Sequence, residues 1–150
     1  MRSLHQLIYQ SQSLVPFEAP ELRALLAQSR RHNGRCGITG VLLYTPDGRF
    51  LQVLEGEEHA VRDLYHHIAQ DPRHACCRVL DEGPSAKRSF AHLSMGFRAA
   101  QACTLRNLLG SVPADGPAWL VPRPHTHAEL LALLEEYMSV EEDLPWMQLQ

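Results

Sequence analysis

Residues 49–56, Arg-Phe-Leu-Gln-Val-Leu-Glu-Gly, constrain the fold of this chain more than any other stretch. They follow the turn signal Thr-Pro-Asp-Gly at 45–48 and a first apolar run over residues 38–44. Two apolar runs joined by such a turn predict a β-hairpin, with residues 49–56 as its returning strand. One amide, Gln52, stands in the middle of the apolar letters of this strand.

The orientation of Gln52 has two readings. Strand side chains alternate between faces, so Gln52 shares a face with Phe50 and Leu54 and points into a core if they do. A buried primary amide has two donors and two acceptor lone pairs, and each needs a partner. The alternative places Gln52 on the solvent face, and strand alternation alone leaves both readings open.

Length and charge limit the class of protein. A chain of 150 residues is long enough for one ordinary domain with its own core. The formal net charge is −3, so there is no electrostatic footprint for nucleic acid. No apolar run is long enough to span a membrane, and the N-terminus has no apolar segment typical of secretion. We therefore expect a cytoplasmic protein that binds neither membrane nor nucleic acid.

Cysteine and histidine spacing predicts no metal site. The four cysteines include the adjacent pair Cys76 and Cys77 but no Cys-x-x-Cys motif, and we expect them to be reduced thiols. Nine histidines are scattered along the chain without the spacing of metal ligands.

Two helices are expected between the strands. The first begins at residues 17–21 and carries Leu22, Leu25, Leu26 and Ser29 on one face, ending near Asn33 and the following glycine. Ser29 and Asn33 at the end of this stripe are either a cap or part of a ligand site. The second helix starts at residues 57–58 and ends at Asp-Pro at 71–72.

The remaining apolar runs predict strands. Residues 4–9 form a short strand followed by a polar loop at 10–14, and residues 76–80 form another that Gly-Pro at 83–84 breaks. A loop from residue 89 leads into a fifth strand that holds Met95 and Phe97. The order βαββαββ predicts an α+β, ferredoxin-like fold with a mixed five-stranded sheet. Both helices should cover one face, with a cleft between them over the middle strands.

Residues 99–150 are expected to form a helical extension to a core of residues 1–98. They comprise a short helix candidate at 104–109, an extended connection over 112–124, and an amphipathic helix that begins with a capping box at 126–129. This last helix is expected either to pack on the exposed face of the sheet, so that C-terminal helices cap it, or to present a partner surface.

The chemically distinctive side chains are uncharged. Tyr9, Ser29, Asn33, Gln52 and Met95 fall on strands and helix ends, and no catalytic motif of a hydrolase, phosphate-binding loop or metalloprotease is present. Such groups suit a planar ligand rich in heteroatoms and are poor general acids or bases.

These residues, in this order of elements, resemble the BLUF domain family, blue-light sensors that use flavin. The resemblance covers roughly residues 3–98. It rests on Leu-Ile-Tyr at 7–9, Ser-Arg-Arg-His-Asn at 29–33 with Gly-Ile-Thr-Gly at 37–40, Phe-Leu-Gln-Val-Leu-Glu-Gly at 50–56, Asp-Pro-Arg-His at 71–74, and Arg-Ser-Phe at 88–90 with Ser-Met at 94–95.

The resemblance implies non-covalent FAD with its ring between the two helices. The residues that it implies for this site are Tyr9, Leu25, Ser29, His32, Asn33, Gln52, Ile68, Asp71, Arg73, His74 and Met95. Of these, Asp71, Arg73 and His74 are implied to lie near the ribityl and phosphate groups. It also implies light-driven proton-coupled electron transfer from Tyr9, after which the hydrogen bonds of Gln52 rearrange. Leu93 departs from the family pattern, since many members have tryptophan there, and Cys36 stands where aspartate is common.

The expected output is not enzymatic. A photoreceptor of this kind should signal through a downstream protein partner of unknown identity or through self-association as a homo-oligomer. Two other readings are a redox flavoprotein that uses FAD chemically and a flavin-free ferredoxin-like interaction module with Gln52 facing solvent.

Overall fold

The computed structural model describes residues 4–14, 17–45, 48–99, 110–112, 119–121, 132 and 134. At residues 74, 76, 98–99, 110–112 and 119–121 it describes the backbone alone. The elements are, in order, β1 Leu4–Ser13, α1 Ala19–Cys36, β2 Thr39–Tyr44, β3 Arg49–Glu57, α2 Glu58–Ala69, β4 His74–Ser85, β5 Gly96–Ala99, β6 Gly110–Val112 and β7 Trp119–Val121.

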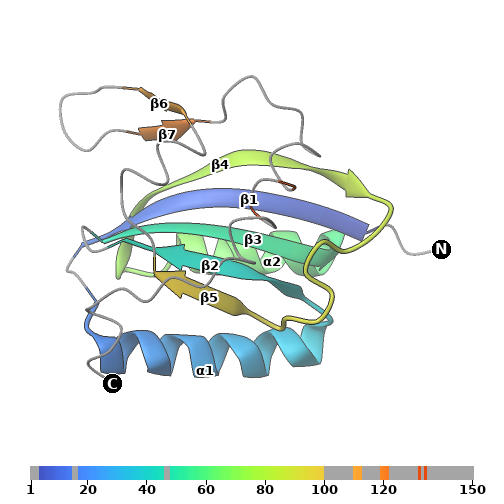
Figure 1. Cartoon of the computed structure of the whole chain (residues 1–150), viewed down its shortest axis with the longest axis horizontal. Helices are drawn as coiled ribbons and strands as arrows, with labels where there is room; N and C mark the ends of the chain where they lie inside the picture. The colour runs from blue at the N-terminus through green and yellow to red at the C-terminus, as the bar shows by residue number, and fades with distance from the viewer. Residues whose placement is uncertain are drawn as a thin grey trace.

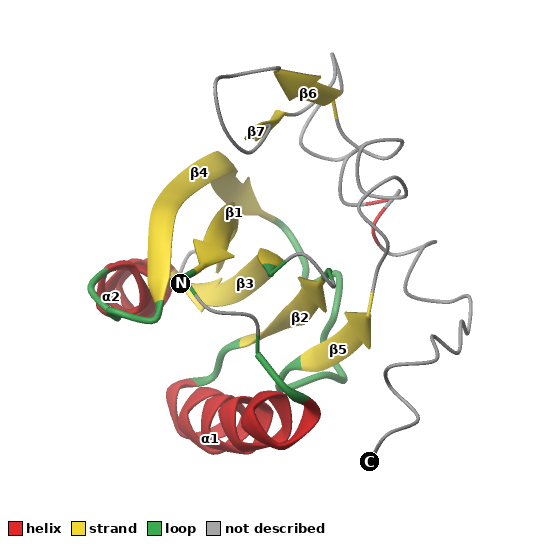
Figure 2. Cartoon of the chain, turned by 90° about the vertical axis from the view of Figure 1, so that its left-hand side faces the viewer, coloured by secondary structure: helices red, strands yellow, loops and turns green. Residues whose placement is uncertain are grey.

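The first five strands form one sheet in the order β4-β1-β3-β2-β5. All neighbouring pairs are antiparallel except β2 and β5, which are parallel, so the sheet is mixed. Figures 1 and 2 show α1 and α2 on the same side of this curved sheet. The expected α+β, ferredoxin-like arrangement of a five-stranded sheet and two helices is confirmed.

Alternation along the central strands divides the core into two clusters. The cluster beneath the helices contains Leu7, Tyr9, Leu22, Leu26, Ile38, Leu42, Tyr44, Phe50, Leu54, Val61 and Met95. The cluster on the opposite face contains Ile8, Val41, Leu43, Leu51, Val53, Phe90 and Leu134. Both faces of the central strands are therefore apolar, and the expected hairpin of β2 and β3 lies at the centre of the sheet.

Helix α1 begins as predicted and ends later than predicted. Glu18 and Glu21 form a capping box, and proline occupies the first turn. The helix continues past Gly34 to Cys36 and ends at Gly37, whose φ of 68° is in the left-handed region that glycine adopts at helix ends. The sequence pattern had placed the end of the helix at Gly34, three residues before the glycine that ends it.

Two strands are longer than the sequence indicated. The polar loop expected at 10–14 is wrong, because β1 continues to Ser13 between β3 and β4 and buries Gln10 and Ser11. The break expected at 83–84 is also wrong, since β4 runs through Pro84, which pairs opposite His5. β4 lies at the edge of the sheet, where a strand tolerates a proline that cannot donate.

The C-terminal extension is described only in part. Gly110–Val112 and Trp119–Val121 pair as a small antiparallel sheet. β7 lies within residues 112–124, the stretch expected to be an extended connection, and β6 shares only Val112 with it. Ala132 and Leu134 are helical, and the fully buried Leu134 belongs to the cluster on the face of the main sheet opposite the two helices. The helix expected at 104–109 and most of the amphipathic helix lie outside the described residues. Among the helices that the structure describes, none is long and apolar enough to cross a membrane.

Candidate functional site

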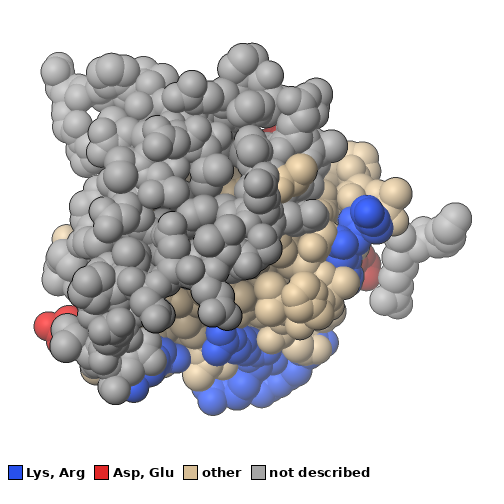
Figure 3. Space-filling view, viewed as in Figure 1, with Lys and Arg blue, Asp and Glu red and all other residues tan. Residues whose placement is uncertain are grey.

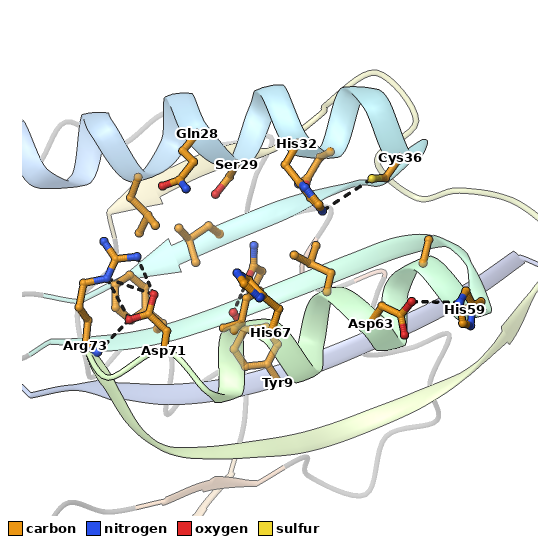
Figure 4. A pocket seen from close by; sticks show the side chains of 18 residues that line it. Tyr9, Gln28, Ser29, His32, Cys36, His59, Asp63, His67, Asp71 and Arg73 are labelled. Carbon is orange, nitrogen blue, oxygen red and sulfur yellow. Dashed lines mark hydrogen bonds and ion pairs between the residues drawn. The ribbon is translucent and has the colours of Figure 1, made fainter.

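A cavity of about 670 Å³ lies between α1 and α2, over the middle of the sheet. Figure 4 shows α1 along one side and α2 along the other. The lining residues are Tyr9, Leu25, Gln28, Ser29, His32, Asn33, Cys36, Leu42, Phe50, Gln52, His59, Ala60, Asp63, Leu64, His67, Ile68, Asp71 and Arg73. This volume is within the usual range for small-molecule and cofactor sites.

Gln52 faces the helices and lies on the floor of this cavity. Its side chain is buried, so the reading that placed it on the solvent face is wrong. Tyr9 is its direct neighbour on β1, and the Tyr9 hydroxyl donates a hydrogen bond to Oε1 of Gln52. Nε2 of Gln52 donates to Sδ of Met95 at 3.3 Å. The amide thus connects an oxidisable phenol to a thioether and still has one N–H and one lone pair beyond these two contacts.

Tyr9 is held in its protonated form. Its side chain is 2% exposed, and its ring packs edge-on against Tyr65 with 5.2 Å between centroids. Burial raises the pKa of Tyr9 well above its usual value, and Cys77 and Tyr65 add smaller effects in the same direction. A neutral phenol of this kind is a hydrogen-bond donor to Gln52, and any electron that it loses must be accompanied by movement of its proton.

Side chains of α1 hold the segment that precedes β5. Nδ2 of Asn33, itself 1% exposed, donates to the backbone oxygen of Ser94 at 3.0 Å. Nε of Arg30 donates to the backbone oxygen of Met95 at 2.9 Å. Met95 was expected inside the fifth strand, but it lies immediately before Gly96, where β5 begins. Its position therefore depends on α1 as well as on Gln52.

One end of the cavity carries an ion pair. Nη2 of Arg73 lies 2.6 Å from Oδ2 of Asp71, and Nε of Arg73 donates to Oδ1 of Asp71 at 3.0 Å. The Arg73 guanidinium also lies over the Phe17 ring, 5.8 Å from its centroid. The hydrogen bonds to Asp71 raise the pKa of Arg73 further. This arginine is half exposed and is a permanent cation beside the cavity.

The structure brings most of the expected site residues together. Nine of them line the cavity: Tyr9, Leu25, Ser29, His32, Asn33, Gln52, Ile68, Asp71 and Arg73. Met95 contacts Gln52 from within the core cluster beneath the helices. His74 opens β4, and its side chain lies outside the described part of the chain.

Several lining residues were not expected. Gln28 and Cys36 line the cavity together with the predicted α1 positions, and Sγ of Cys36 lies 3.7 Å from Nε2 of His32. His59, Asp63 and His67 follow one another at four-residue spacing on α2 (Figure 4). Helical periodicity alone would have placed each set on one face.

Leu93, the position where many family members have tryptophan, does not line the cavity. It is half-buried and packs against the cluster on the other face of the sheet, near Val41 and Phe90. Its backbone oxygen accepts a hydrogen bond from the amide of Gly40.

The family model described as sensors of blue light using FAD matches residues 4–96. The chain belongs to the BLUF family. FAD is the chromophore of BLUF domains, so the expected family, fold and cofactor are confirmed together.

Two curated relatives resemble the BLUF region. The photoactivated adenylate cyclase subunit beta of Euglena longa is 38% identical over 88 residues, which are 59% of this chain and 10% of the relative. The blue light- and temperature-regulated antirepressor BluF of Escherichia coli K12 is 35% identical over 71 residues, 47% of this chain and 17% of the relative. The chain spans about a tenth of the length of the cyclase relatives that it matches.

A solved structure resembles nearly the whole chain. The dark-state structure of BlrB, a BLUF protein, is 30% identical with a TM-score of 0.70, and the match covers 91% of this chain and 98% of that one.

The cavity fits the BLUF chromophore. The isoalloxazine ring of FAD is planar, with an apolar benzenoid side and a carbonyl and nitrogen edge. The cavity offers the amides of Gln52 and Asn33 on one part of its wall and Leu25 and Ile68 on others. Arg73 supplies a cation of the type that binds phosphate.

Proposed function

We propose that Tyr9, Gln52 and Met95 form the light-driven switch of this BLUF sensor and that the cavity between α1 and α2 holds its FAD. The observation that carries the proposal is the position of the Gln52 amide, which accepts from Tyr9 and donates to Met95. An amide can exchange donor and acceptor roles without a charge being buried, whereas an unpaired charge at this site would cost several kcal/mol.

The proposed binding roles follow the chemistry of the cavity wall. Gln52, Asn33 and Ser29 would hydrogen-bond the polar edge of the ring, with His32 beside them. Leu25 and Ile68 would pack against its faces from α1 and α2. Asp71, Arg73 and His74 would lie near the ribityl and phosphate groups, where the Arg73 cation offsets phosphate charge.

When bound, FAD supplies a ring that absorbs blue light and becomes a strong oxidant. Tyr9 would give one electron to that oxidant, and its acidic proton would pass to the Gln52 side chain, which already accepts the hydroxyl hydrogen bond. Return of the electron and the proton would restore neutral Tyr9 and leave the Gln52 amide turned over or tautomerised. Turning the amide over would place its oxygen opposite Met95 in place of the Nε2 donor, so the Gln52–Met95 hydrogen bond would be lost.

The proposed output is a change in binding. The groups nearest the switch are a phenol, an amide and a thioether, which suit signalling better than acid–base catalysis. We infer that the chain acts without enzymatic activity of its own, through a downstream protein partner or as a homo-oligomer. Residues 99–150 would take part as an extension of a core at 1–98, and the burial of Leu134 against the sheet supports this.

Infrared difference spectroscopy tests the proposed role of Gln52. In FAD-loaded protein labelled with isotopic glutamine, blue light should shift an amide carbonyl band that carries the label. The band should vanish in Gln52→Leu and persist in Gln28→Leu, since Gln28 lines the cavity but is exposed on α1. A labelled band that survives in Gln52→Leu would refute the assignment.

A further inference from the structure

The outward face of α1 is strongly basic. Arg23, Arg30, Arg31 and Arg35 are all exposed, and Figure 3 shows Lys and Arg side chains gathered along α1 at the lower edge of this view. This excess of positive charge is a local feature of that face, because the whole chain has a formal net charge of −3. We call these four arginines the α1 basic face.

Helical geometry turns the α1 basic face away from the buried residues of this helix. At 100° per residue, Arg23 and Arg30 fall on one line and Arg31 and Arg35 on the next, with exposed Ala27 and Gly34 between them. The core residues Leu22, Leu26 and Asn33 lie on a different side of the helix. The small residues let a partner approach the helix backbone closely, and the arginines lie on both sides of these residues.

The arginines of this face have charge available for a partner. Within the described residues, Arg23, Arg31 and Arg35 take part in no hydrogen bond or ion pair with another side chain. Arg30 differs, because its Nε is bound to the backbone oxygen of Met95. One member of the α1 basic face is therefore tied to the residue that the Gln52 amide contacts.

The hydrogen bond between Arg30 and Met95 couples the Gln52 amide to the α1 basic face. The Gln52–Met95 hydrogen bond and the Met95–Arg30 hydrogen bond are consecutive, at 3.3 and 2.9 Å. When the amide turns, Met95 loses its donor and is free to move with its carbonyl. Arg30 then loses its acceptor, and its guanidinium becomes available to join the other three arginines.

We propose that the α1 basic face is a docking surface for an acidic protein segment and that release of Arg30 tightens this docking in the light. The inference rests on the proposed Gln52 switch. The four arginines lie within 13 residues of helix, an axial rise of about 18 Å, which matches a short acidic peptide. A nucleic acid or a membrane would present a longer anionic surface and would meet the net negative charge of the rest of the chain.

The test uses the FAD-loaded full chain and a 12-residue polyglutamate peptide. The peptide carries a far-red dye, so that reading its anisotropy does not excite flavin. Affinity is measured at low salt in the dark and under blue light. One additional exposed ion pair should tighten binding about two- to five-fold in the light. Raising the salt concentration should weaken binding in both states.

Three variants separate charge from coupling. The combined change Arg23→Gln, Arg31→Gln and Arg35→Gln should abolish most binding in both states. Arg30→Lys keeps the charge but lacks the guanidinium Nε, so it should bind in the dark and lose most of the light effect while its flavin spectrum still shifts. Arg62→Gln, an exposed arginine of α2, should bind as the unaltered protein does.

Each outcome has a distinct consequence. A normal flavin red shift with equal dark and light affinity, or full binding by the triple variant, would overturn the inference and leave the proposed switch standing. Absence of the red shift would instead contradict the switch. A twelve-nucleotide oligothymidylate and vesicles containing phosphatidylserine are tested in the same way. If either binds more tightly in the light than the peptide does, an acidic protein segment is refuted as the occupant.

Discussion

Tyr9 and Gln52 stand directly opposite each other on β1 and β3, and the Tyr9 hydroxyl donates to the Gln52 side-chain oxygen beneath both helices. Cross-strand register fixes this contact, because a shift of one residue would turn either side chain to the other face of the sheet. The pair is thus positioned by backbone pairing over nine residues of β1 rather than by flexible loops.

The first prediction concerns the two members of this pair. Tyr9→Phe and Gln52→Leu should each retain flavin and lose the reversible red shift, because one removes the transferable proton and the other the amide that receives it. Absorption spectra before and after blue light measure both properties. Tyr44→Phe is the matched control, since this buried tyrosine accepts from the amide of Phe17 at 2.7 Å and does not line the cavity. A normal photocycle in Tyr9→Phe would refute the assigned role.

The second prediction follows from the raised pKa of Tyr9. Tyrosine in the unfolded chain ionises near pH 10, whereas buried Tyr9 ionises only at higher pH. Between these two values, ionisation therefore stabilises the unfolded state relative to the folded state. Stability supplied by this group is present below pH 10 and is lost as the pH rises toward the folded pKa. Urea unfolding between about pH 8 and about pH 11.5 should show a steeper loss of unfolding free energy with pH in the unaltered protein than in Tyr9→Phe. Equal slopes would contradict burial of a neutral phenol.

Sequence patterns predicted the centre of the molecule better than its edges. The inward position of Tyr9, Asn33 and Gln52 was implied by the resemblance to the BLUF family, because strand alternation alone left two readings for Gln52. The hairpin and both helices follow from local periodicity and turn signals. The continuation of β1 past Tyr9 did not, because Gln10 and Ser11 are buried only through pairing with strands distant in sequence.

Other features needed the assembled fold. Proline at position 84 is acceptable only because β4 is an edge strand, and edge position is a property of the whole sheet. The hydrogen bond from Arg30 to the carbonyl of Met95 joins residues 65 apart in sequence, and no local sequence motif predicts it.

The third prediction concerns Glu55, a fully buried carboxylate on β3. Its Oε2 accepts from Nε2 of Gln6 at 2.6 Å and from the amide of Ser89 at 2.7 Å, and its Oε1 accepts from the amide of Phe90 at 2.7 Å. Glu55→Ala leaves these donors buried without an acceptor and should lower the free energy of unfolding by about 3 kcal/mol. Denaturant unfolding measures the change.

The control for Glu55 is a surface carboxylate. Glu58 pairs with Arg62 at 3.2 Å in an exposed i,i+4 contact. Glu58→Ala should cost about 0.5 kcal/mol or less. A similar loss from both variants would show that the Glu55 contacts contribute no more than a surface ion pair.

The fourth prediction compares two glycines. A Cβ at Gly40 would lie 1.9 Å from the backbone oxygen of Val53, so Gly40→Ala should force β2 away from β3 and lower stability by about 3 kcal/mol or more. A Cβ at Gly34 would meet nothing within 4 Å, and Gly34→Ala in the interior of α1 should raise stability by about 0.5–1 kcal/mol. Thermal unfolding of the two variants should move in opposite directions, and a tolerated Gly40→Ala would contradict the close strand approach.

The absorption spectrum of the FAD-loaded protein in the dark, under blue light and after return to the dark tests whether Tyr9 and Gln52 act on FAD bound between α1 and α2. We expect a small red shift of the flavin band that reverses fully in the dark. Failure to bind FAD, or flavin bleaching without dark recovery, would contradict it.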